Sequence, residues 1–147
     1  MRAALLAVAL MFTVAPARAQ IAVIVNKENP IGNLTLADLE RLYLGRQTSF
    51  ANGAAVALGE FGPARHAFYR TVLHMNETAV SRHWIGIVFS EQNATPPREF
   101  RNWEDVRQFV MSTRGAICFI DWASVNDNVK VLTIGGRGPQ DARYFVR

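Results

Sequence analysis

Short runs of β-branched and other apolar residues alternate with amphipathic segments along this chain, and that alternation limits the folds open to it. The apolar runs cover residues 21–26 (IAVIVN), 54–58 (AAVAL), 115–122 (GAICFIDW) and 129–134 (VKVLTI). Strands separated by helices favour right-handed crossovers and a mostly parallel sheet. We therefore predict an α/β fold with a mixed, mostly parallel sheet flanked by helices. The closing pair of strands is where an antiparallel neighbour could join.

Segments between these runs carry the signals of helix starts. Thr35 with Asp38, and Asn102 with Asp105, have the spacing of capping boxes, and Asn76 opens a third helix. The apolar stripe expected on that third helix consists of Val80, Trp84, Ile87 and Val88. These patterns predict helices that bury one side and leave the other in solvent.

The first nineteen residues have the pattern of a cleavable targeting segment and not of a folded one. Arg2 precedes an apolar run, and Ala17-Arg18-Ala19 fits the small-x-small cleavage pattern. The apolar run is too short to cross a hydrocarbon core of about 30 Å. We therefore expect a signal peptide over residues 1–19 and a single domain over residues 20–147. The protein would be periplasmic or secreted, of bacterial type, with no membrane span after cleavage.

The charge balance of the predicted mature chain is mild. Of the 16 basic residues, Arg2 and Arg18 belong to the signal peptide, which leaves 14 against 12 acidic residues. An excess this small argues against a nucleic-acid partner. Cys118 is the single cysteine, so an internal disulfide is excluded, and its apolar surroundings predict a buried, unreactive thiol.

The stretch LGEFGPARHAFYRTVL, residues 58–73, predicts a strand that turns at Gly62 and Pro63 into a helix whose first turn carries Arg65. Open α/β sheets bind ligands beyond the carboxyl ends of their strands, and the N-terminus of a helix there attracts anions. The residues leave two interpretations open: a turn that binds an anion, or a turn with a structural role alone.

The sequence contains no pattern typical of a catalytic or metal site. His66, His74 and His83 lie eight and nine residues apart, which is not the spacing of metal ligands. Nucleophile-elbow, zinc-protease, P-loop and paired-cysteine motifs are all missing. We therefore expect no enzyme activity, no cofactor and no bound metal.

Four segments, taken in order, resemble the phosphate-type substrate-binding proteins of ABC importers, specifically the short periplasmic ones. These segments are IVNKENPIGNLTLADLERLYLG, GPARHAFYRTVL, HWIGIVFSEQNATPP and GAICFIDW. The resemblance implies one lobe of a type II periplasmic binding protein fold that binds a small, phosphate-like oxyanion reversibly. It also implies an ABC transporter permease, or another envelope protein, as partner.

In such relatives, backbone N–H groups, hydroxyls and an arginine at a helix start hold the anion. The predicted ligand-binding residues are Gly62, Ala64 and Arg65 at the helix start and Thr95 from a neighbouring loop, with Asn26 added for its place at the end of the first strand. Gly62 stands where relatives commonly have serine, and the chain is too short for both lobes of a full-length relative. The alternative is a ligand-free protein-interaction or accessory module built on the same lobe. A homodimer would let a second copy supply the missing lid.

Overall fold

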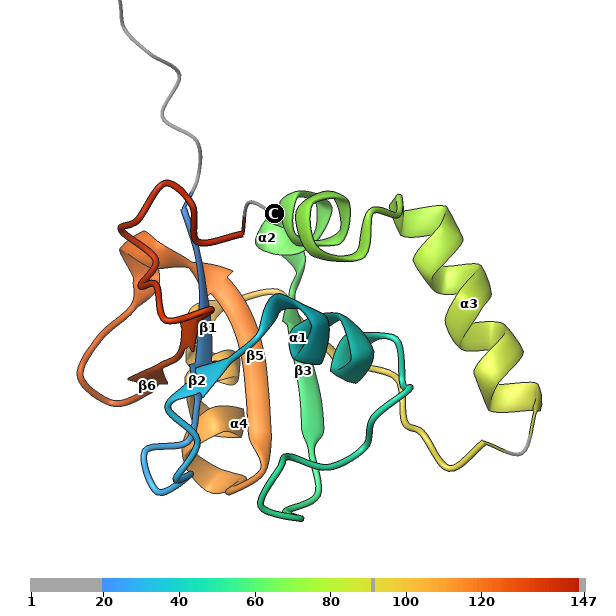
Figure 1. Cartoon of the computed structure of the whole chain (residues 1–147), viewed down its shortest axis with the longest axis horizontal. Helices are drawn as coiled ribbons and strands as arrows, with labels where there is room; N and C mark the ends of the chain where they lie inside the picture. The colour runs from blue at the N-terminus through green and yellow to red at the C-terminus, as the bar shows by residue number, and fades with distance from the viewer. Residues whose placement is uncertain (1–19, 91, 146–147) are drawn as a thin grey trace, which may run out of the picture.

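The computed structural model describes residues 20–90 and 92–145, so the predicted signal peptide lies outside the described residues. A five-stranded sheet forms the centre of the molecule, in the order β4-β3-β5-β1-β6 (Figure 1). Its strands are β1 (Ile21–Val25), β3 (Ala57–Phe61), β4 (Arg98–Phe100), β5 (Ala116–Asp121) and β6 (Lys130–Val131). β1 and the first five residues of β5 are buried along their length, as expected of strands covered on both faces.

Strand directions confirm a mixed, mostly parallel sheet. β3 pairs in parallel with both β4 and β5, whereas β1 is antiparallel to β5 and to β6. Four of the five strands therefore run the same way. The antiparallel pairing expected of the closing strands is therefore present, and its partner in both cases is the first strand, which runs opposite to the other four. A strand buried on both faces has the same apolar composition in either direction, so composition does not reveal its orientation.

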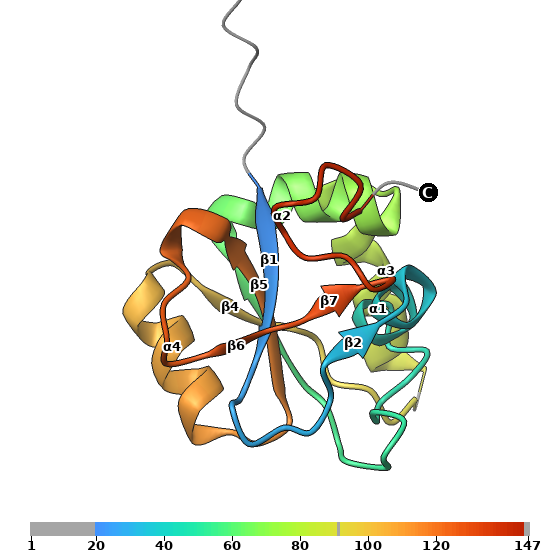
Figure 2. The same ribbon diagram turned by 60° about the vertical axis from the view of Figure 1, so that its left-hand side comes forward.

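Helices cover both faces of the sheet (Figure 2). On one face lie α1 (Leu36–Tyr43) and α2 (Gly62–Phe68), which continues directly into the π-helical turn η1 (Tyr69–Leu73). The opposite face is covered by α4 (Trp103–Ser112), whereas α3 (Glu77–Phe89) lies to the side of the body (Figure 1). Among the described residues, no helix is both long and apolar enough to cross a membrane.

The predicted helix starts are confirmed at three positions. Thr35 and Asp38 form a complete capping box at α1, in which each side chain bonds the other residue's backbone N–H. Asn76 and Asn102 cap α3 and α4 through their side-chain oxygens. The stripe on α3 is buried except at Val88, which is 56% exposed, so the predicted stripe was wrong at that residue.

Aromatic side chains fill the core between the sheet and α1–α2. The rings of Phe68 and Phe119 stack with centroids 3.9 Å apart, and Tyr43 packs against both rings. The neighbouring Cys118 is fully buried, and burial raises the pKa of its thiol well above the ordinary value. The predicted burial of this cysteine is confirmed.

Four short strands were not predicted as they occur. Residues 129–134 do not form one strand, because β6 ends at Val131 and β7 (Thr133–Ile134) pairs with β2 (Asn33–Leu34) in a separate parallel pair. β4 was assigned to no element. The chain completes its path with the 3-10 turn η2 (Trp122–Ser124) after β5.

Candidate functional site

The turn between β3 and α2 lies at the carboxyl end of the parallel strands. Gly62 begins α2 directly after Phe61, the last residue of β3, and Phe61 pairs with Phe100 at the end of β4. Pro63 follows in the first helical turn, as predicted. Among the described residues, no side chain caps this helix start, whereas α1, α3 and α4 all have side-chain caps. In this part of the chain, its first N–H groups therefore differ from those of the other helices in having no side-chain acceptor.

Arg65 reaches two carboxylates from this turn. Its Nη2 donates to Oε1 of Glu99 at 2.9 Å, and its Nη1 lies 3.6 Å from Oε1 of Glu60. Its Nε is buried and finds no acceptor among the described residues. Burial lowers the pKa of the guanidinium, but the two neighbouring carboxylates outweigh that effect and raise it above its usual value.

Glu60 is the buried member of this cluster. It belongs to β3 and accepts a hydrogen bond from the hydroxyl of Tyr69 in η1. Desolvation raises the pKa of Glu60, while the Tyr69 hydrogen bond and the charge of Arg65 act in the opposite direction. Burial and the Glu60 carboxylate also raise the pKa of the Tyr69 hydroxyl. Because these side chains contact one another directly, the protonation state of each one affects the pKa of the others.

The Glu60–Arg65–Glu99 cluster changes the chemistry expected of the turn. An oxyanion bound to Arg65 would compete with carboxylate oxygens for the same N–H donors. Glu99 is 44% exposed at its side chain and can move aside, whereas Glu60 is held by Tyr69 and by burial. The residue pattern predicted neither glutamate as a site residue. Glu60 had a signal, because an acid stands two positions before Gly62 in a predicted strand, but Glu99 comes from a distant strand.

Gly62 and Ala64 lie at the turn with Arg65, as predicted. An added Cβ at Gly62 would lie 3.5 Å from Arg65 Nη2 and 3.5 Å from the Phe100 carbonyl oxygen, which is ordinary contact. Gly62 is therefore not required by crowding. The Ala64 side chain is buried and packs into the core. Arg65 thus carries the polar side-chain chemistry contributed by these three residues.

Asn26 lies at the other end of the sheet. It follows Val25, which pairs with Ile117 near the start of β5, whereas Glu60 pairs with Phe119 further along. Its side-chain amide donates to the carbonyls of Val110 and Met111 at 2.8 and 2.9 Å and ties β1 to the end of α4. The structure does not bring Asn26 together with Arg65.

Thr95 is also separate from the turn. It lines a partly open cavity of about 240 Å³ together with Leu42, Val56 and Trp84. The register of β4 against β3 begins at Arg98 opposite Gly59, so Thr95 precedes that pairing and lies toward the start of β3. Of the five predicted site residues, three lie together and two lie in different places.

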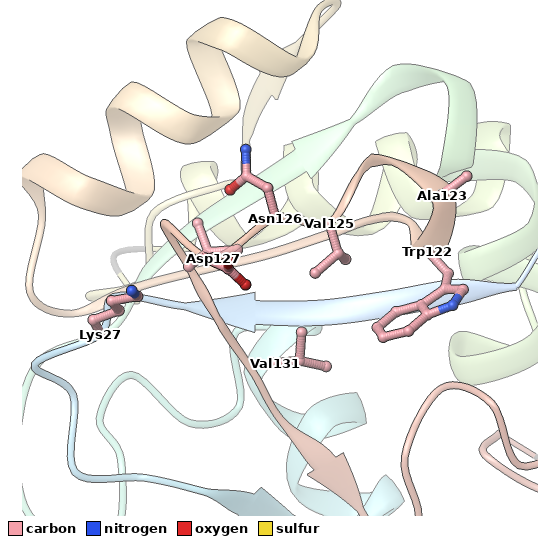
Figure 3. Close-up of a pocket in the computed structure, with 8 residues that line it drawn as sticks. Lys27, Trp122, Ala123, Val125, Asn126, Asp127 and Val131 are labelled. Carbon is pink, nitrogen blue, oxygen red and sulfur yellow. The ribbon is translucent and has the colours of Figure 1, made fainter.

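A larger cavity of about 750 Å³ lies along β1 and is open to solvent. The two arms of the β5–β6 connection frame it, with Lys27 at one end and Trp122 at the other (Figure 3). Lys27 and Asp127 place charges of both signs on its walls, and Val125 and Val131 line its middle. The described residues of its walls therefore carry no excess of positive charge that would favour an anion.

The histidines form no metal site in the part of the chain that the structure describes. His83 Nε2 lies 2.8 Å from the carbonyl oxygen of Leu44, and His66 Nδ1 lies 4.0 Å from Glu77. No three His, Cys, Asp or Glu side chains among residues 20–90 and 92–145 come together where they could hold a metal ion.

Comparison with known proteins finds solved structures with a similar fold. No family model matches the chain, and no curated protein matches it in sequence. Similar solved structures include an ABC-type phosphate transport receptor from Vibrio cholerae, with a TM-score of 0.66 and 19% identity over 84% of this chain and 49% of that one. A putative phosphate ABC transporter substrate-binding protein from Clostridium perfringens, solved with bound phosphate, gives 0.66 and 20% over 84% and 48%.

A third similar structure is PstS from Borrelia burgdorferi, with a TM-score of 0.60 and 12% identity over 86% of this chain and 53% of that one. The chain thus spans about half the length of the structures it resembles. At these identities the likeness concerns the fold. The chain therefore has the fold of a single lobe of a phosphate-type periplasmic substrate-binding protein.

Proposed function

We propose that this protein is a periplasmic or secreted solute-binding module of the phosphate-type ABC transport class, and that it binds a small oxyanion reversibly at the start of α2. The observation that carries this proposal is the position of Arg65: it lies in the first turn of an uncapped helix, at the carboxyl end of parallel strands. Anions bind where helix N-termini and cationic side chains converge. The fold likeness to phosphate transport receptors supports the same class.

Binding at this turn proceeds by exchange. The oxyanion replaces the Glu99 carboxylate at Arg65 Nη2, and Glu99 moves into solvent, where it is already partly exposed. Glu60 remains in place and lowers the affinity through its negative charge. Because one lobe leaves the anion partly hydrated, we expect millimolar rather than nanomolar binding, a difference of roughly 8 kcal/mol.

The exchange is tested by calorimetric and thermal-shift titrations of residues 20–147 with phosphate and sulfate. Glu99→Gln removes the competing carboxylate, so we expect it to tighten anion binding by about tenfold, the equivalent of about 1.4 kcal/mol. Arg65→Ala should abolish binding. Arg70→Ala is the matched control, because Arg70 lies on the exposed side of the same helical segment.

Two results would refute the oxyanion proposal. One is the absence of stabilisation by 20 mM phosphate or sulfate in both the natural chain and Glu99→Gln, since a specific ligand must stabilise the folded state. The other is stabilisation that persists unchanged in Arg65→Ala. The transporter side of the proposal, with a permease or another envelope protein as partner, requires a separate binding measurement with that partner.

A second candidate function is a ligand-free interaction or accessory module on the same lobe. The observation that favours it is the occupation of Arg65 by the chain's own carboxylates. An exposed apolar face on α3, formed by Ile85, Val88 and Phe89, is a surface on which a partner could pack. Sedimentation of the natural chain and of Phe89→Ser tests self-association through that face.

A further inference from the structure

A short exposed loop before β3 carries an asparagine followed by glycine. An antiparallel bridge between Ser49 and Ala55 closes this loop, which lies at the opposite end of β3 from α2 (Figure 1). Asn52 and Gly53 are both exposed at its tip, and the Asn-Gly pair occurs once in the sequence. The pair matters because a side-chain amide can react with the backbone nitrogen of the residue that follows it.

A hydrogen bond holds the Asn52 side chain along the following peptide. Its Oδ1 accepts from the Ala54 N–H at 3.1 Å. Because Oδ1 is bonded to Cγ, this contact keeps Cγ near the intervening nitrogen of Gly53. The same N–H polarises the side-chain carbonyl and stabilises the negative charge that develops on Oδ1 when a nucleophile attacks Cγ. The turn therefore holds an electrophilic carbon close to a backbone nitrogen.

This side-chain turn recurs in the chain, and the residue that follows each asparagine distinguishes the cases. In the part of the chain that the structure describes, the side-chain oxygens of four asparagines accept from the N–H two residues later, namely those of Asn26, Asn29, Asn52 and Asn126. Asn26 and Asn29 are buried, which keeps water and base away. Asn29 also precedes Pro30, which has no N–H to lose.

Asn126 is the close counterpart of Asn52. Both are exposed, and Asn126 Oδ1 accepts from the Asn128 N–H at 3.0 Å. Asn126 precedes Asp127, whose side chain obstructs the approach of its backbone nitrogen to Cγ. Gly53 has no Cβ, so its nitrogen can approach closely. Of the two exposed turns, the one at Asn52 is therefore the reactive one.

A second hydrogen bond opposes the reaction at Asn52. The Gly53 N–H donates to the Phe50 carbonyl at 2.9 Å. The nitrogen must leave that acceptor and lose its proton before it attacks. The net strength of one such hydrogen bond corresponds to a factor of about ten in rate. The fold therefore slows the reaction without preventing it.

We propose that Asn52 is a site of spontaneous modification, at which the asparagine is converted into aspartate and isoaspartate through a cyclic succinimide. The Gly53 nitrogen gives up its proton and forms a bond to Asn52 Cγ. The bond from Cγ to Nδ2 then breaks, and Nδ2 leaves as ammonia with that proton. Water that breaks the new bond yields aspartate, whereas water that breaks the original peptide bond yields isoaspartate. No atom is oxidised or reduced.

Either product changes the loop. A carboxylate replaces a neutral amide, so the modified chain gains a negative charge. Isoaspartate also lengthens the main chain by one carbon inside the turn that holds the buried Phe50. This modification is independent of the oxyanion proposal, because the loop and the Arg65 cluster share no residue.

The reaction is measured by incubating the natural chain in mildly alkaline buffer, with and without concentrated urea. Brief digestion with trypsin releases residues 47–65, in which Asn52 is the single asparagine, and residues 115–130, which contain Asn126. Mass spectrometry measures the acid in each peptide, and chromatography separates aspartate from isoaspartate. In the folded chain, we expect Asn52 to convert at least about tenfold faster than Asn126. In urea, Asn52 should convert about tenfold faster again.

Two variants exchange the residue that follows the asparagine. Gly53→Ala adds a Cβ beside the attacking nitrogen and should slow the conversion of Asn52 about tenfold. Gly53 has a φ of 81°, which alanine adopts with strain, so the comparison is repeated in urea, where the turn is absent. Asp127→Gly creates an Asn-Gly pair in the matched turn and should raise the conversion of Asn126 toward the rate at Asn52.

The proposal is overturned if Asn52 of the folded chain converts no faster than Asn126. It is also overturned if the folded chain keeps the Asn52 amide while the chain in urea loses it, because the turn would then prevent the reaction. Accumulation of both acids in the peptide of residues 47–65, with a succinimide detected at weakly acidic pH, would support it. Gain of the reaction at Asn126 in Asp127→Gly would support the role of the following glycine.

Discussion

At the scale of single residues, the candidate site centres on Arg65, which interacts with the carboxylates of both Glu60 and Glu99. A buried carboxylate survives in a strand when its charge is compensated, and Glu60 is compensated by Arg65 and by the Tyr69 hydroxyl. Compensation is incomplete, because the pKa of Glu60 still lies above its ordinary value. The folded state therefore binds a proton at Glu60 more readily than the unfolded state does.

This difference predicts a pH dependence of stability. Between the unfolded pKa of about 4.5 and the higher folded pKa, Glu60 is protonated in the folded state and ionised in the unfolded one. The contribution of Glu60 to the free energy of unfolding therefore falls as pH rises through that window, and it is most favourable below it. Glu60→Gln, a neutral isostere, should remove this component.

The measurement is urea denaturation of the natural chain and Glu60→Gln at intervals from pH 4 to pH 8. The difference in the free energy of unfolding between the two proteins isolates the contribution of Glu60. Carboxylates whose pKa is lowered in the folded state, such as Asp38, contribute equally to both proteins and cancel. A difference that is independent of pH would contradict the raised pKa. A difference of the opposite sign would mean that Arg65 outweighs desolvation.

At the scale of helices and strands, the sequence predicted correctly the features that depend on residues close together in the chain. The helix starts at Thr35, Asn76 and Asn102 are set by side chains that bond N–H groups three residues away, so the sequence contains the whole signal. β4 differs, because its place depends on pairing with β3, more than thirty residues earlier. The direction of β1 likewise depends on distant strands.

The residues of the candidate site likewise fall into two groups, those placed by local sequence and those placed by long-range strand pairing. Gly62, Ala64 and Arg65 are neighbours along the chain, so the predicted turn places them together. Glu99 joins them only through the pairing of β4 with β3, and the positions of Thr95 and Asn26 depend on which end of the sheet each segment reaches. Their contacts are long-range, and a single sequence does not encode them in a readable pattern.

The capping box of α1 gives a prediction at this scale. Thr35→Ala removes the side-chain acceptor for the Asp38 N–H and one of the donors to the Asp38 carboxylate, so it should lower the free energy of unfolding by about 1 kcal/mol. Chemical denaturation measures it. Thr78→Ala is the control, because Thr78 is exposed in the first turn of α3, and there alanine should be neutral or stabilising by up to about 0.5 kcal/mol. Equal losses in both variants would contradict the specific role of the cap.

At the scale of the whole molecule, the end of the described chain closes the sheet. β6 pairs with β1 at Ile24 and Val25. At the preceding residue of β1, Val23, the backbone N–H and carbonyl still form hydrogen bonds with groups distant in the sequence. Leu132 donates its N–H to the Val23 carbonyl, and the Val23 N–H donates to the Tyr144 hydroxyl at 3.3 Å. That hydroxyl in turn donates to the Leu132 carbonyl at 2.7 Å. Tyr144 thus continues the pairing where β6 has ended and covers an otherwise open stretch of β1.

The role of Tyr144 in joining the tail to the sheet can be tested with two substitutions. Tyr144→Phe keeps the buried ring but leaves the Val23 N–H without an acceptor, so the free energy of unfolding should fall by about 1–3 kcal/mol. Tyr144→Ala also removes the ring and should cost about 3–5 kcal/mol. Amide hydrogen exchange adds a local readout, because the Val23 amide should lose protection in both variants by more than the change in global stability. If both the stability and the Val23 exchange of Tyr144→Phe match those of the natural chain, the hydroxyl does not hold β1. The tail would then pack on the sheet through its aromatic rings alone.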